Sequence, residues 1–230
     1  MNHKLRQAIL SGACAIALGA AVAPSMALAD NITLTGDGTW ASSGMPGGEP
    51  RTIANAATGD NVDIALFALE VADNGSADDG GGDHAFSLGA ITNSSTMTGS
   101  LLMQENRTFL SGNDVTISVS SIDIKVANPV VAGTDGVLLI KNNVATFGLA
   151  NSNTVTVAGD VIANSINLEN TELIPTAEKL VRLNVAGNVE TVDGITLEER
   201  GFLTLNGTFA QTVTGVIDSV GVADRGFIEV

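Results

Sequence analysis

Residues 153–168 read NTVTVAGDVIANSINL, and their pattern indicates how the chain folds. The stretch contains three short runs rich in apolar and β-branched residues, 154–158, 161–163 and 166–168. Such runs are typical of β-strands, and the first alternates polar with apolar side chains as a half-buried strand does. Gly159-Asp160 and Asn164-Ser165 separate the runs, and residues of these types favour tight turns. The stretch therefore predicts three short strands joined by very short corners.

Part of this stretch recurs further along the chain. Residues 184–189, NVAGNV, repeat residues 156–161, TVAGDV. Short strands that repeat in this way are typical of a parallel β-helix or β-solenoid, in which successive coils stack around a narrow interior. Aromatic residues make up only 3% of the chain, which suits an interior filled by smaller aliphatic side chains. We expect an all-β chain with this fold; the alternative is an antiparallel β-sandwich, with Asp193-Gly194 and Asn206-Gly207 as hairpin turns.

Alternating or apolar runs predict further strands at 115–119, 122–126 and 203–205, and one apolar strand at 62–71. Only the stretch 176–183, which follows a proline, indicates a short helix.

Three regions follow one another along the chain. Residues 1–29 have a basic start, an apolar run and the small-residue site Ala27-Leu28-Ala29, which together predict a secretory signal peptide of the Sec type. Residues 30–100 are interrupted by stretches rich in glycine and acidic side chains and predict an N-terminal β cap region with Gly/Asp-rich loops. Residues 101–230 predict the solenoid-like repeat region. The protein is therefore expected outside the cell or on its outer surface.

Removal of the signal peptide would change the chemistry available to the chain. Cys14, the only cysteine, would leave with it as a filler residue rather than a lipid-attachment site, so disulfides and zinc–thiolate sites are not expected. Lys4 and Arg6 would also leave, which changes the net charge from −15 to −17. An acidic surface repels nucleic acid, so nucleic-acid binding is not expected. No later apolar run is long enough for a transmembrane helix.

A cluster of acidic residues set among glycines is the candidate metal site. Carboxylate oxygens on a glycine-rich loop are suitable ligands for Ca²⁺. The spacing matches neither the EF-hand loop nor the nonapeptide calcium repeat, so the alternative is a solvated acidic loop. No other cofactor is expected. The members of the cluster are Asp73, Asp78, Asp79 and Asp83.

Catalysis is not expected from the remaining residues. His84 is the only histidine after the signal peptide, and neither Ser76 nor Ser87 near it lies in a G-x-S-x-G sequence. Paired carboxylates for glycoside hydrolysis would have to come from scattered positions in a chain with few cations and one tryptophan, Trp40. Those carboxylates are Asp123, Asp135, Asp160 and Glu169.

Residues 201–218, GFLTLNGTFAQTVTGVID, followed by 226–230, GFIEV, resemble the passenger repeats of autotransporters and related large bacterial surface proteins. Residues 31–40 and 86–93 are similar in character. The resemblance implies a secreted β-solenoid passenger displayed for adhesion or surface coating. Proteins of that family carry a membrane β-barrel after the passenger, which is not found up to Val230, so we expect either a passenger fragment or a free-standing subunit.

Together these features predict a secreted or cell-surface structural or adhesive protein. Its expected partners are other copies of itself, or a ligand on a host or other surface. The alternatives are a secreted polysaccharide-active enzyme on the same β-helix fold and a calcium-dependent extracellular module.

Overall fold

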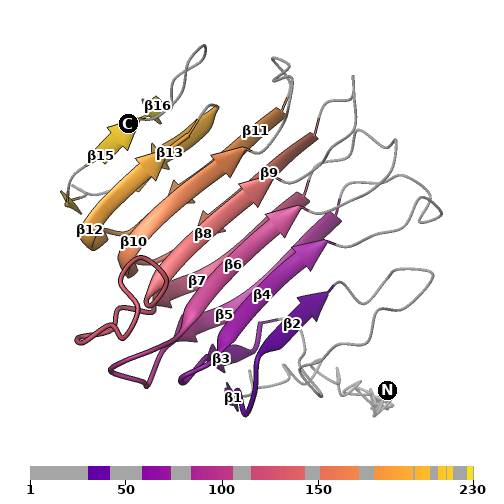
Figure 1. Cartoon of the computed structure of the whole chain (residues 1–230). Coiled ribbons are helices and arrows are strands. Elements are labelled where there is room, and N and C mark those ends of the chain that lie inside the picture. Colours follow the sequence, from indigo (N-terminus) through magenta and orange to yellow (C-terminus); the bar gives the residue numbers. More distant parts are fainter. Residues whose placement is uncertain are drawn as a thin grey trace, which may run out of the picture.

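The computed structural model describes residues 31–41, 59–73, 84–105, 115–142, 151–170, 179–198, 200–207, 212–215, 217–219 and 227–229. Within this part the chain forms sixteen β-strands and no helix, with β1 and β2 at one end of the stack and β15 and β16 at the other (Figure 1). The strands are β1 (Asn31–Thr33), β2 (Gly38–Ala41), β3 (Asn61–Asp63), β4 (Ala68–Asp73), β5 (His84–Thr92), β6 (Ser100–Glu105), β7 (Val115–Asp123), β8 (Val137–Asn142), β9 (Asn151–Val157), β10 (Val161–Asn170), β11 (Lys179–Val185), β12 (Val189–Leu197), β13 (Gly201–Leu205), β14 (Val213–Thr214), β15 (Ile217–Ser219) and β16 (Phe227–Glu229).

Every pairing among the described strands is parallel, and the pairings form three ladders. The first ladder contains the starts of β5 and β7, then β9, β11, β13 and β16. The second contains β1, β3, the ends of β5 and β7, the starts of β10 and β12, and β14. The third contains β2, β4, β6, β8, the ends of β10 and β12, and β15. The chain visits the ladders in turn, which makes it a parallel β-solenoid.

The predicted repeat lies where two coils stack. Val157 pairs with Val185 in the first ladder, and Val161 pairs with Val189 in the second. The predicted β-solenoid is therefore confirmed. The β-sandwich alternative is wrong, because it requires antiparallel pairing.

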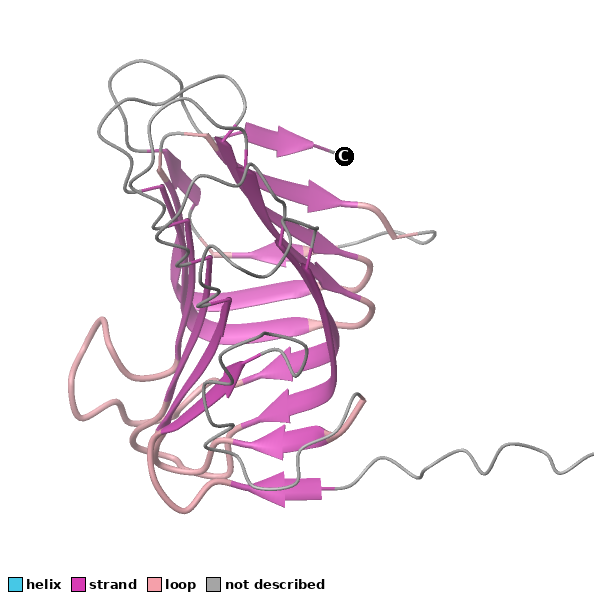
Figure 2. Cartoon of the chain, turned by 90° about the vertical axis from the view of Figure 1, so that its right-hand side faces the viewer, coloured by secondary structure: helices cyan, strands magenta, loops and turns pink. Residues whose placement is uncertain are grey.

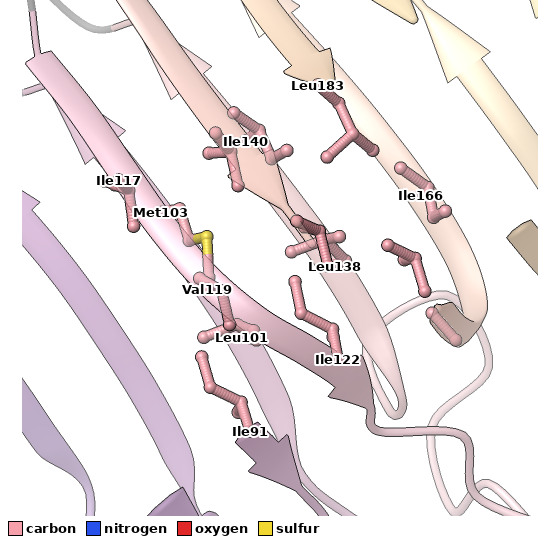
Figure 3. Packing of buried hydrophobic residues seen from close by; sticks show 14 of the residues in the cluster. Ile91, Leu101, Met103, Ile117, Val119, Ile122, Leu138, Ile140, Ile166 and Leu183 are labelled. Atoms are coloured by element: carbon pink, nitrogen blue, oxygen red, sulfur yellow. The ribbon is translucent and has the colours of Figure 1, made fainter. Parts of the chain in front are cut away.

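Aliphatic side chains form columns along the inside of each ladder, and Figure 3 shows members from all three ladders meeting in the interior. Identical register positions in successive coils carry similar side chains, which allows close packing between neighbouring coils. Each fully buried Val, Ile or Leu contributes about 1.5–3 kcal/mol by leaving water. The column of the second ladder is Ile32, Val62, Ile91, Ile122, Val161, Val189 and Val213; that of the third is Leu69, Leu101, Leu138, Ile166, Ile195 and Ile217.

Polar side chains at the corners tie each coil to the next. Between the first and second ladders, Asp160 Oδ1 accepts the amide N–H of Asn188 at 2.7 Å, and Asn188 Oδ1 accepts that of Thr212 at 3.0 Å. A Cβ on Gly187 would lie 2.5 Å from the carbonyl oxygen of Gly159, so the corner admits no side chain there. The repeated Gly-Asp and Gly-Asn pairs thus satisfy backbone donors where the ladders are interrupted.

The coils differ in length, so the chain has no constant repeat. Residues that hydrogen bond between neighbouring coils are separated by 30 positions for Asn31 and Asn61, but by 38 for Val126 and Asn164. The extra residues lie in loops at the corners, and Figure 2 shows the described loops, in pink, projecting beyond the edges of the strand layers. The longest of those between the second and third ladders joins β7 to β8.

Several predicted elements differ from the structure. The strand predicted at 115–119 and the start of that predicted at 122–126 form one strand, β7, and the corner predicted at Asn164-Ser165 lies inside β10. The single strand expected at 62–71 is two strands, β3 and β4, which belong to different ladders and flank a turn at Ala65, where φ is +50°. The helix expected at 176–183 is replaced over residues 179–183 by β11, because parallel pairing with β9 satisfies its backbone; residues 176–178 lie outside the described part.

Asp193-Gly194 lies inside β12, next to a register irregularity, and is not a hairpin turn. The described strands of residues 30–100 pair within the same three ladders as the later ones.

Truncation of one interior column tests this packing. Leu138 is fully buried, whereas Leu66 is 58% exposed. We expect Leu138→Ala to lower the free energy of unfolding by about 2–5 kcal/mol, because it leaves a cavity in the third-ladder column. The matched variant Leu66→Ala should change it by no more than about 0.5 kcal/mol. Urea denaturation followed by circular dichroism measures both, and equal losses would contradict the assigned burial.

Candidate functional site

The predicted calcium cluster falls mostly outside the described residues. Asp73 ends β4, where its backbone pairs with Glu105, but Asp78, Asp79 and Asp83 lie outside the described part. Among the residues that the structure describes, no group of His, Cys, Asp and Glu side chains is arranged to hold a metal ion. The calcium site therefore stays a prediction.

The only histidine after the predicted signal peptide and the single tryptophan both lie in strands. His84 begins β5, and its backbone pairs with Val115. Trp40 lies in β2, and its backbone pairs with Val71. Ser87 is exposed on β5, three residues after His84, and Ser76 is outside the described residues.

The four carboxylates considered for glycoside hydrolysis serve separate local roles. Asp160 accepts a corner amide, and Asp135 Oδ2 accepts the amide of Val131 at 2.7 Å within the β7–β8 loop. Glu169 forms an ion pair with Lys141 at 3.6 Å on the third ladder. Asp123 ends β7 on the second ladder. Only Glu169 lines the groove on the outer side of the third ladder, so the four carboxylates do not converge on one cleft.

A groove of about 500 Å³ lies over the outer side of the third ladder. Its floor crosses β4, β6, β8 and β10 along one row of outward register positions, which places Leu102 and Leu139 side by side between Glu70 and Asn167. Val137, at a neighbouring outward position, is only 7% exposed. The floor is therefore apolar at its centre, on the side of the sheet that normally carries polar side chains.

One wall of the groove is the turn at 131–135 in the β7–β8 loop, which contributes Gly133 and Thr134. The turn is held by its own hydrogen bonds. Thr134 donates to the carbonyl oxygen of Val131 through its amide and through Oγ1, both at 3.2 Å, and the carboxylate of Asp135 accepts the Val131 amide. The wall is thus preformed rather than shaped by a ligand.

Carboxylates surround the apolar floor. Asp37 and Glu70 lie at the β4 end and Glu169 at the β10 end. Glu70 accepts a hydrogen bond from Gln104 Nε2, and Asp37 accepts the amide of Ala68 at 3.0 Å, so neither contact neutralises a charge. Next to Glu169, burial and then repulsion from Glu169 raise the pKa of Glu198. Lys141 pairs with Glu169, but Glu198 adds a second carboxylate beside them, so both ends of the groove keep a net negative charge.

A second feature is an exposed row of apolar side chains at the corner between the second and third ladders. Leu66, Met97, Val130 and Val131 are 58%, 52%, 60% and 53% exposed, and we call these four residues the apolar corner ridge. They lie on three successive coils. Thr98 Oγ1 donates a hydrogen bond to the carbonyl oxygen of Leu66 at 3.1 Å. The amide N–H of Val130 donates one to the carbonyl oxygen of Met97 at 3.2 Å. The corner loops are thus stacked on one another.

Sequence reasoning missed both the groove and the ridge. One signal was present: residues 101–103, LLM, and 137–140, VLLI, are apolar without alternation, which is typical of strands covered on both sides. The ridge residues stand singly in polar loops and become neighbours only when the coils stack.

Comparison of the chain with protein-family models, with curated proteins and with solved structures found no match. Among the described residues there is no helix of the length and apolarity that a membrane crossing requires.

Replacement of Glu198 tests whether burial and repulsion from Glu169 destabilise its ionised form. Because the folded pKa of Glu198 is raised, its contribution to stability is present at low pH and is lost as pH rises through the folded pKa. Glu198→Gln cannot ionise, so we expect it to melt at a higher temperature than the parent at pH 7. The difference should vanish below the ordinary pKa of 4.5, where both side chains are neutral. A variant that melts lower than the parent at pH 7 would contradict this assignment.

Proposed function

We propose that the protein is a secreted or cell-surface structural or adhesive protein that works by contact through the outside of its solenoid. The single observation that carries this proposal is the apolar corner ridge. Single exposed apolar side chains are ordinary, but apolar side chains gathered on one surface mark interaction sites. Here four large ones lie on three successive coils of one corner.

The architecture supports a role in contact. Coils that pair in register hold their outward side chains at fixed spacings of about 4.8 Å along the stack. The ridge lies in corner loops of this stack that hydrogen bond to one another, so it loses less conformational freedom than separate loops would when it meets another surface, which favours binding. The signal peptide and the resemblance to autotransporter passengers, both predicted from the sequence, support a location of this surface outside the cell.

The acidic composition predicts how association depends on salt. The whole chain has a formal charge of −15, so two copies repel at low ionic strength. At about 0.15 M salt, charges further apart than about 8 Å are largely screened, whereas apolar contact is not weakened. Self-association through the ridge should therefore increase with salt.

The test replaces Leu66, Met97 and Val130 together with serine. We expect the purified parent protein to form dimers or larger assemblies in sedimentation velocity as concentration and salt rise, or to be retained on cell or polymer surfaces. The triple variant should lose most of this association because its ridge no longer offers apolar area.

Val192→Ser is the matched control, since Val192 is also 60% exposed but lies on β12, away from the ridge. It should behave as the parent does. A parent protein that stays monomeric and binds no surface would refute the proposed function, as would a triple variant that associates like the parent.

A further inference from the structure

The groove over the third ladder differs from the apolar corner ridge in that its charges select what can enter. Leu102 and Leu139 form an apolar centre, while Glu70 and Asp37 lie at one end and Glu169 at the other. A ligand that covers the floor must therefore be apolar in the middle, and it is favoured if it carries positive charge at both ends.

The length of the groove limits the size of the ligand. The floor spans three strand-to-strand steps of about 4.8 Å from Glu70 to Asn167, and Glu169 lies two residues further along β10, so the charged ends are about 16 Å apart. An extended polypeptide advances about 3.3 Å per residue, so about five residues cover this span.

Other ligand classes fit less well. Nucleic acid is repelled by the carboxylates. Sugars bind to sites with aromatic and polar side chains, whereas this floor consists of leucine and valine at its centre. A second copy docked groove to groove would bring the same carboxylates together, which opposes that arrangement.

We propose that this groove binds an extended segment of a partner polypeptide in which aliphatic side chains lie between two lysine or arginine residues. The aliphatic side chains that face the floor cover Leu102 and Leu139, and one cation pairs with Glu70 and Asp37. The other cation pairs with Glu169, which it shares with Lys141. Glu70 is already oriented by Gln104, which is buried, so little freedom is lost when the cation arrives.

The probe is a blocked pentapeptide with lysine at both ends and valine, leucine and valine between them. Binding to the full chain is measured by isothermal titration calorimetry or fluorescence polarisation at low and high salt. We expect binding that weakens as salt rises, and no detectable binding of a peptide with glutamate at both ends or of one with three serines in the middle.

Two kinds of variant locate the site. Glu70→Gln with Glu169→Gln should weaken lysine-peptide binding about three- to tenfold, the effect of two partly exposed ion pairs. Glu190→Gln is the matched control, because Glu190 also pairs with a lysine, Lys125, but lies on the second ladder. Leu139→Asn should abolish binding, and its melting temperature shows whether the fold persists; the Gln variants keep the test valid if it does not.

Three results would overturn the proposal. They are no binding of the lysine peptide, equal binding of the lysine and glutamate peptides, and an effect of Glu190→Gln as large as that of the groove variants. The ridge variants leave the groove floor and its carboxylates intact, so failure of the proposed contact function and failure of this inference are distinguishable.

Discussion

The parallel, in-register stacking of one coil on the next is the constraint on which the rest of the structure depends. Backbone hydrogen bonds fix which residue lies over which, and the inward columns then fill with side chains of one type, as in the second-ladder column from Ile32 to Val213. Corner side chains such as Asp160 and Asn188 supply acceptors where the ladders are interrupted. Because register is set inside, the outward side chains occupy defined positions as well.

The two surface features are departures from the alternation that this stacking normally imposes. The outward row from Glu70 to Asn167 would be polar throughout in a sheet with one wet side, yet its centre is Leu102 and Leu139. The corner loops would be polar too, yet they align Leu66, Met97 and Val130. Neither departure adds to the interior, which is why both are proposed as contact surfaces.

The fold was predictable from local patterns, and the sites were not. Residues 184–189 repeat residues 156–161, and the two segments form corners that stack on each other, so this repeat predicts the solenoid directly. The prediction of one strand at 62–71 was wrong because the corner at Ala65 lies within a run of apolar residues, which gives no turn signal. The prediction of a helix at 176–183 was wrong because parallel pairing overrides local helix propensity. Leu102 and Leu139 are neighbours because of the register between β6 and β8. This register could not be predicted, because the coils differ in length. The calcium cluster lies outside the described residues, apart from Asp73.

Disulfide trapping tests the parallel register most directly. In a Cys14→Ser background the chain has no cysteine, and Ser118 and Thr156 are register partners on the outside of the first ladder. Cysteines there would lie about 4.8 Å apart between Cα atoms, within disulfide range, whereas Ser118 and Asn184 are two steps, about 10 Å, apart. The stacked solenoid predicts that Ser118→Cys with Thr156→Cys forms an intramolecular disulfide and that Ser118→Cys with Asn184→Cys does not. Equal crosslinking of both pairs, or of neither, would contradict it.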